Sequence, residues 1–271
     1  MSNMTVSLLI TTYNWVAALE QVLLSVKEQT CLPKEVVVAD DGSGQQTADL
    51  IASLQASFPT KLVHCWHEDK GFRAAAIRNK AIAEMTADYV VMIDGDMVLH
   101  PSFIQDHLCS ASKGSFIQGS RVITSPAAAD RLLSGQKSMH FLSSGISNRF
   151  NALRLPLLSS LVSACDESIH GTKTCNFSAW RSDLIDINGF DESYVGWGRE
   201  DSDLVARLFH SGKHRLKLKL MANAYHLYHA ENSRGSLSCN DTLLTNCIKE
   251  KTTWCVNGID KHLENKELKS D

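Results

Sequence analysis

Apolar runs of strand length alternate with helix-like segments over the first hundred residues of this chain. The runs are Val6–Thr11, Lys34–Ala39, Lys61–Trp66 and Tyr89–Ile93. Between the first two, apolar residues recur at helical spacing, and the segment Ala74–Met85 is alanine-rich and helix-like. Strands that alternate with helices through short loops form parallel sheets with right-handed crossovers. The sequence therefore predicts an α/β fold built on a mostly parallel sheet.

Acidic residues follow two of these predicted strands. Asp94 and Asp96 flank a single glycine, and Asp40-Asp41 precedes another. Open parallel sheets bind ligands beyond the carboxyl ends of their strands, and side chains two residues apart on an extended segment point the same way. Paired carboxylates suit Mg²⁺ or Mn²⁺ and a bridging diphosphate. An isolated Asp-x-Asp also occurs in ordinary turns, but its position at a strand end favours a nucleotide site.

A second acidic cluster lies far along the chain, in Gly189–Asp203. Glu200, Asp201 and Asp203 precede a helical pattern that begins at Leu204. Carboxylates are favoured at a helix start by its free amides and its dipole. Helix capping and catalysis are therefore both compatible with this window taken alone.

Composition excludes several classes of protein. The chain has 271 residues and a net charge of −3, which argues against a nucleic-acid binder. Its eight cysteines are scattered without a Cys-x-x-Cys pair, which fits neither a zinc site nor a small disulfide scaffold. The start lacks the basic region of a signal peptide, and no run of eighteen apolar residues occurs. We expect free thiols and a cytoplasmic location.

Five motifs carry a family resemblance. Thr11–Asn14, Val38–Ser43, Gly71–Asn79 and Asp94–Asp96 resemble, in order, the signatures of family 2 glycosyltransferases of the GT-A fold. Asn188–Glu192 together with Gly196–Asp201 resembles the C-terminal half of beta-1,4-galactosyltransferases and chondroitin-type polymerases. The resemblance covers about residues 4–100 and 170–230 and implies one GT-A domain. Its nucleotide-sugar-binding half would be 1–100, its acceptor-binding and catalytic half 101–230, and its helical tail 231–271.

The resemblance implies a set of nucleotide contacts along the predicted rim. They are Thr11, Tyr13, Asn14, Asp40, Asp41, Arg73, Arg78 and Asp94. Either Asp40 or Asp41 would contact the uracil or the ribose, with Asp40 favoured; an Asx-type turn with Gly42 is the alternative. Arg78 is better supported than Arg73, since arginine pairs readily with phosphate.

The resemblance also implies a metal site with Mn²⁺ or Mg²⁺. Asp96 is the preferred ligand, and a histidine near His226-Leu-Tyr-His229 would complete the shell. We predict a strand over Lys217–Tyr225, and on an extended continuation His226 and His229 would face opposite sides. Only one would then bind the metal, and the motif favours His229.

Asp201 is implied as the catalytic base, with Glu200 binding the acceptor or orienting the loop. Trp197 and Gly198 would contribute to acceptor binding, because a tryptophan between glycines suits stacking on a sugar; a core tryptophan is the alternative. Ser202 stands where related enzymes often have a third consecutive acid. That departure affects acceptor recognition rather than the base.

These residues predict an inverting, metal-dependent glycosyltransferase. It would move galactose, N-acetylgalactosamine or glucose from a UDP-sugar to a glycan or glycolipid acceptor of a bacterial surface, such as lipopolysaccharide, O-antigen or capsule, with a β-linkage. A nucleotidyltransferase is one alternative, but no glycine-rich, lysine-containing loop occurs near residues 11–20. A catalytically inactive sugar-binding subunit is another, and the presence of both Asp96 and Asp201 argues against it.

The segment 137–164 matches no motif. It mixes leucines and phenylalanines with Lys137, Arg149 and Arg154, and Pro156 interrupts it. A helical pair packed into the core is the default prediction. An acceptor flap is a second reading, and a surface in peripheral contact with the inner membrane is a third, since apolar and basic residues interleave.

Overall fold

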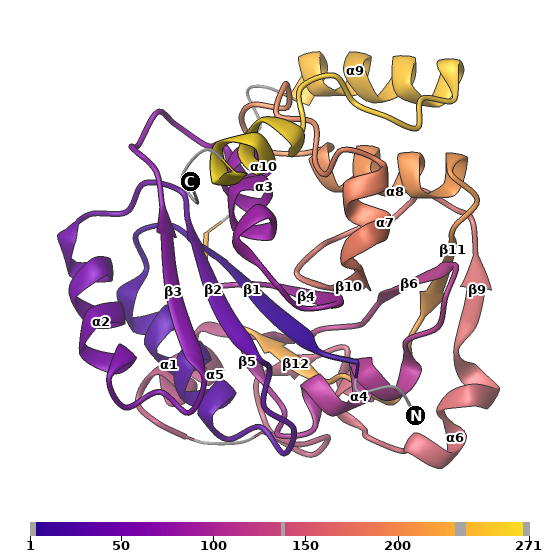
Figure 1. Ribbon diagram of the computed structural model, residues 1–271. Coiled ribbons are helices and arrows are strands. Elements are labelled where there is room, and N and C mark those ends of the chain that lie inside the picture. Colours follow the sequence, from indigo (N-terminus) through magenta and orange to yellow (C-terminus); the bar gives the residue numbers. More distant parts are fainter. Residues whose placement is uncertain (1–3, 137–138, 231–236, 268–271) are drawn as a thin grey trace.

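A large mixed sheet forms the centre of the molecule in the computed structural model, which describes residues 4–136, 139–230 and 237–267 (Figure 1). The sheet order is β3-β2-β1-β4-β10-β6-β11-β9. Its strands are β1 (Val6–Thr12), β2 (Glu35–Asp40), β3 (Lys61–Trp66), β4 (Tyr89–Asp94), β6 (Ser115–Gln118), β9 (Ala164–Asp166), β10 (Asn176–Trp180) and β11 (His214–Lys217).

Strand register brings the predicted acidic ends together. β1 runs parallel to β2 and β4, with Thr12 opposite Asp40 and Thr11 opposite Asp94. Antiparallel β10 pairs with β4 and β6, and β6 is parallel to β11, so both β6 and β11 run in the same direction as β4. The predicted α/β fold with a mostly parallel sheet is confirmed. The carboxyl ends of six strands share one rim.

Helices cover both faces of this sheet because its strands are apolar on both sides. Leu8 and Ile10 of β1 belong to one core and Leu9 to the other. The first core packs under α1 (Val16–Lys27), α2 (Gln45–Gln55) and α4 (Phe103–Ser110). The second packs under α3 (Ala74–Glu84), α7 (Arg181–Asp186), α8 (Glu200–His210) and α10 (Asp260–Glu267), and α9 (Leu237–Glu250) lies against α8 (Figure 1).

A second, small sheet continues from the Asp94–Asp96 turn. Its order is β5-β12-β7-β8, with β5 (Met97–Leu99), β12 (Ala224–His226), β7 (Val122–Thr124) and β8 (Ile146–Ser147), and α5 (Pro126–Leu133) packs on it. His226 pairs with Met97, and the Leu227 amide donates to the Asp96 carbonyl over 2.9 Å. This pairing attaches the histidine segment directly to the acidic turn.

The predicted strand Lys217–Tyr225 is wrong. β11 ends at Lys217 in the large sheet, and β12 begins at Ala224 in the small one. Between them Leu220 and Ala222 have φ of 58° and 51°, left-handed values that an extended strand does not contain. The Ala222 carbonyl accepts from Asn176 and its amide donates to Asp106, which fixes the change of direction.

The predicted helical pair in 137–164 is also wrong as a core element. Apart from residues 137–138, which lie outside the described residues, the segment contains β8, a 3₁₀ turn η1 (Arg149–Ala152) and the short α6 (Pro156–Val162). Pro156 begins α6, because its fixed φ and missing amide suit the first turn. Leu157 and Leu161 are 94% and 79% exposed. The apolar residues of α6 therefore face outward.

Candidate active site

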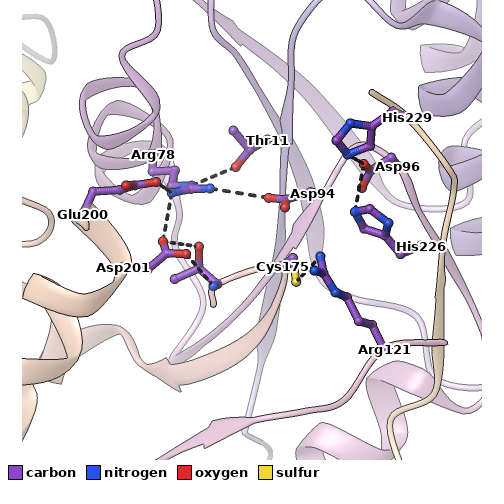
Figure 2. Close-up of polar contacts among 11 residues, drawn as sticks. Thr11, Arg78, Asp94, Asp96, Arg121, Cys175, Glu200, Asp201, His226 and His229 are labelled. Carbon is purple, nitrogen blue, oxygen red and sulfur yellow. Dashed lines mark hydrogen bonds and ion pairs between the residues drawn. The ribbon is translucent and has the colours of Figure 1, made fainter. Parts of the chain in front are cut away.

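Arg78 is the centre of a polar cluster at the carboxyl rim of the large sheet (Figure 2). From the second turn of α3 its Nε donates to Thr11 Oγ1 over 3.1 Å. Its Nη2 lies 3.4 Å from Asp94 Oδ1. Its Nη1 lies 3.2 Å from Asp201 Oδ1 and 3.5 Å from Glu200 Oε1, both on the first turn of α8. One arginine thus joins acids from the two halves of the chain.

Burial and charge at this cluster oppose each other. Burial disfavours the Arg78 cation, but Asp201, Asp94 and Glu200 keep the pKa of Arg78 above its ordinary value. Burial, together with the neighbouring charge of Asp201, raises the pKa of Glu200 to about 7. Burial likewise raises the pKa of Asp94 to about 6, against the attraction of Arg78. Three carboxylates around a single guanidinium leave an excess of negative charge.

Thr174 donates hydrogen bonds to both carboxylate oxygens of Asp201. Its Oδ2 accepts from the Thr174 amide over 3.0 Å, and its Oδ1 accepts from the Thr174 hydroxyl over 2.7 Å. Thr174 precedes β10, the antiparallel strand beside β4. The carboxylate thus has a fixed orientation between α8 and the loop that leads into β10. That orientation fits a base that must accept a proton from one direction.

Asp96, His226 and His229 form a second cluster beside the first. Asp96 Oδ2 lies 3.4 Å from His226 Nε2 and 3.2 Å from His229 Nε2. One potential ligand atom from each residue lies within 4.8 Å of the others. Within the described part of the chain, buried Asp96 Oδ1 and His226 Nδ1 have no hydrogen-bond partner. A carboxylate and two imidazoles at this spacing fit a divalent metal ion.

Both histidines belong to this cluster, which corrects the expectation that they face opposite sides. β12 ends at His226, so the chain is no longer extended between the two residues. Their rings lie 5.1 Å apart between centroids, and Trp15 meets His229 edge to face at 6.0 Å. The Asp96 carboxylate raises the pKa of His229 to about 9, whereas burial lowers that of His226 to about 4.

Sequence reasoning missed two residues of the site. Thr174 fixes Asp201, and Arg121 extends toward the space between the two clusters, where its Nη1 lies 3.8 Å from the buried Cys175 Sγ (Figure 2). The signal for Thr174 was the short strand that follows it, Asn176–Trp180. Arg121 follows Gly119 and Ser120, the two residues after β6, and carried no motif of its own.

Asp40 and Asp41 both have partners within the fold, and the role of Asp40 as a base contact stays a prediction. It is fully buried, and its oxygens accept from the Ser43 amide and contact His64 Nε2, both over 2.8 Å. Asp41 lies nearer the surface, with Oδ1 2.6 Å from His67 Nε2 and Oδ2 accepting from the Arg73 amide over 2.8 Å. The Asp40–Ser43 bond is the local turn chemistry that the alternative reading anticipated.

The remaining predicted nucleotide residues lie in the loop after β1 and at the start of α3. Tyr13 is exposed, and its hydroxyl donates to Asp69 Oδ2 over 2.9 Å. Asn14 has a left-handed φ of 47° and accepts from the Gly44 amide, so its side chain supports the start of α2. The Arg73 guanidinium donates to the Glu68 carbonyl.

Trp197 and Gly198 lie in the loop that enters α8. Trp197 is 38% exposed, and the glycines on either side have φ of 80° and 103°, which only glycine adopts readily. The tryptophan is therefore not a core residue. Its stacking role, and that of Gly198, stay predictions.

Two family models match the chain. Glycosyl transferase family 2 matches residues 7–158, and the N-terminal domain of galactosyltransferase matches residues 158–230. The Asp94–Asp96 turn falls in the first region, and Asp201 and both histidines fall in the second.

The chain is similar to longer curated enzymes. It is 28% identical to a validoxylamine A glucosyltransferase from Streptomyces hygroscopicus subsp. limoneus, over 76% of this chain and 48% of that protein. It is 24% identical to a chondroitin synthase from Escherichia coli, over 76% of this chain and 32% of that protein. The chain thus spans half or less of the length of these two relatives.

Solved structures share the fold. S. aureus TarS 1-349, crystallised in complex with UDP, matches with a TM-score of 0.62 at 16% identity and covers 97% of this chain and 70% of that one. Within the described ranges no helix has the length and apolarity to cross a bilayer. The first family model covers more than half of the sequence. The matched residues include the acids that follow β2 and β4 at the rim. The chain belongs to glycosyl transferase family 2.

Proposed function

We propose that this chain is an inverting, metal-dependent glycosyltransferase that moves a sugar of the galactose, N-acetylgalactosamine or glucose class from a UDP-sugar to a bacterial surface glycan. The observation that carries the proposal is the pair of adjoining clusters at one sheet rim. Asp96, His226 and His229 offer a cation site, and Asp201 offers a fixed carboxylate next to it. Asp94 and Arg121 lie between them.

The ligand set favours Mn²⁺ over Mg²⁺. Imidazole suits the later divalent metals, whereas Mg²⁺ strongly prefers oxygen, and manganese accepts both. The unpartnered Asp96 Oδ1 and His226 Nδ1 are consistent with a site completed by a cation and its waters. When bound, the metal would neutralise the diphosphate leaving group.

The transfer requires one proton acceptor and no covalent intermediate. Asp201 takes the proton of the acceptor hydroxyl while that oxygen forms a bond to C1 of the donor sugar. The bond from C1 to the diphosphate oxygen breaks on the opposite face, and UDP leaves with the bonding electrons. Arg78 and Thr174 act as positioning residues, since they hold the Asp201 carboxylate toward the rim. A donor with an α-linkage then gives a β-linked product.

The nucleotide is assigned to UDP by analogy with the TarS complex and by the rule that open parallel sheets bind ligands beyond the carboxyl ends of their strands, here β1 and β2. Asp41, rather than the fully buried Asp40, is the acid nearer to a base or ribose at this position. Glu200, Trp197 and Gly198 are assigned to the acceptor side at the start of α8. A catalytically inactive sugar-binding subunit would have no need of the Asp201 orientation.

A donor panel tests the function without a known acceptor. UDP- and GDP-sugars are incubated with Mn²⁺, and slow hydrolysis is followed by NMR, which also reads the anomer first released. We expect a UDP-hexose to be hydrolysed with inversion, and hydrolysis to stop with chelator or with Asp96→Ala. Undiminished hydrolysis in chelator would remove the metal from the proposal. Release of the retained anomer would remove the direct displacement.

A further inference from the structure

A cationic pocket of about 260 Å³ lies on the same rim as the candidate active site, beyond β10. Its walls include Gln118 at the end of β6 with Ser120 after it, Lys217 at the end of β11 with Lys219 after it, and His170. Lys217 pairs with Gln118 in register, and both strands run in the direction of β4. The pocket therefore opens at the end of the sheet where Asp94 and Asp201 lie, on the side away from β1 and β2.

The charge of this pocket is positive. Lys217 Nζ forms an ion pair with Asp166, a carboxylate that Arg215 also holds. Lys219 Nζ donates to Ser120 Oγ over 2.9 Å, and in the described part of the chain no carboxylate lies within ion-pair distance of it. Together with the exposed His170, which also lines the pocket, these lysines offer hydrogen-bond donors to an anion.

An exposed apolar face lies directly beside Lys219. The inner side of α6 is bonded to this lysine: Ser159 Oγ donates to the Lys219 carbonyl over 2.7 Å, and the Lys219 amide donates to Ser163 Oγ over 3.0 Å. Its outer side, the α6 apolar face, is formed by Leu157, Leu158, Leu161 and Val162, which are 94%, 48%, 79% and 50% exposed. Residues at this spacing form one stripe, and such a stripe marks a binding surface.

The pocket is also connected to the predicted base. Gln118 Nε2 donates to the Gly171 carbonyl at the pocket wall over 2.8 Å, and three residues later Thr174 donates to Asp201. Three residues span at most about 11 Å. A short saccharide can therefore extend from an anion in the pocket to the Asp201 carboxylate.

We propose that the acceptor is a saccharide linked through phosphate to a lipid. The phosphate occupies the cationic pocket, the hydrocarbon chain lies on the α6 apolar face, and the sugar hydroxyl reaches Asp201. This assignment rests on the proposed transferase function and names its acceptor class. A neutral glycan would use neither Lys219 nor the exposed leucines, and a soluble anionic glycan would use only the pocket.

Three probes test the pocket and the α6 apolar face separately. Geranyl diphosphate can occupy both, inorganic diphosphate only the pocket, and geraniol only the apolar face. Binding of each probe to the full chain is measured by calorimetry in chelator with UDP present, which removes metal-mediated binding at the nucleotide site. We expect geranyl diphosphate to bind most tightly. Lys219→Gln should weaken it about tenfold, the scale of one charge-assisted contact. The double variant Leu157→Ser/Leu161→Ser should reduce it to the affinity of inorganic diphosphate.

Matched controls lie on remote exposed surfaces. Lys249→Gln on α9 and Val256→Ser, which alters a residue that is 93% exposed, should bind the probe as the wild type does. The proposal is overturned if geranyl diphosphate binds no more tightly than inorganic diphosphate, or if the test variants match the controls. Should the probe fail while the wild type still hydrolyses UDP-sugar, only the acceptor assignment fails. Should the probe bind as expected without any hydrolysis, the transferase function fails and the pocket remains.

Discussion

Arg78 shows how much of the site one residue organises. Its side chain contacts Thr11 and Asp94 from the first half of the chain and Glu200 and Asp201 from the second. The motif resemblance predicted Arg78 as a nucleotide contact, but sequence alone gave no reason to join it to the acids of α8. Such a link between residues more than a hundred positions apart depends on tertiary packing.

Asp201→Asn should lose most of the transfer rate while retaining donor and metal binding. The amide has nearly the same volume, but it cannot take the acceptor proton. Loss of a general base typically lowers the rate by a factor of about 10² to 10⁴. Single-turnover transfer, or hydrolysis of the UDP-sugar, measures the effect, and Asp49→Asn on the exposed face of α2 serves as control. A near-normal kcat in Asp201→Asn would transfer the role to Glu200.

Glu200→Gln should become more stable relative to the wild type as pH rises from 5 to 8. Burial and Asp201 raise the pKa of Glu200 to about 7 in the folded protein, well above that of an exposed glutamate. The wild type therefore loses stability as pH passes through that range, because folding must then bury a charged carboxylate. Thermal unfolding at both pH values tests this, with the exposed Glu20→Gln as control. An equal difference at both pH values would contradict it.

At the scale of elements, the strands of the first half were predictable because each is a continuous apolar run that ends in polar residues. β3 matches the predicted bounds, β2 is shifted by one residue, and β1 and β4 each extend one residue further. The failure at Lys217–Tyr225 has a local cause. Apolar Leu218, Leu220 and Met221 resemble a strand, yet the left-handed backbone at Leu220 is imposed by contacts from elsewhere in the fold.

The wrong strand prediction at Lys217–Tyr225 is also the reason why His226 was not expected beside His229 at Asp96. The sequence placed His226 and His229 on opposite sides of a strand, but β12 stops at His226, and its pairing with β5 carries both imidazoles to Asp96. The turn that receives them was predicted from Asp94-Gly-Asp96 alone. The residues of the candidate metal site were thus predictable in their types but not in their number.

Gly95→Ala should weaken metal binding at this turn by more than tenfold. An added Cβ would meet Thr12 Oγ1 at 2.9 Å and the Thr11 carbonyl oxygen at 3.1 Å, so the turn must move away from β1 and take Asp96 with it. Overpacking of this kind costs about 1–3 kcal/mol of stability. Calorimetric titration with Mn²⁺ and thermal unfolding measure both effects. Gly44→Ala is the control, since its Cβ approaches only Asn14 Oδ1, at 3.9 Å.

At the scale of the molecule, UDP with Mn²⁺ should protect separate segments of one rim from amide exchange. These are the ends of β1 and β2, the Asp94–Asp96 turn and the segment 226–229, because they converge only in the folded sheet. Exchange measured by mass spectrometry with and without ligand reads this directly. Protection limited to α9 and α10 would place the nucleotide elsewhere.

The position of β10 has a consequence for how the chain is made. This strand inserts between β4 and β6, although about eighty residues separate it from β4 in sequence. Ribosomes add roughly 5–20 residues per second, so β4 emerges about ten seconds before its neighbour. During that interval β4 presents an unpaired, strongly apolar edge, the kind of edge that associates with other chains. We therefore expect β4, which leads into the candidate active site, to need chaperone protection during synthesis.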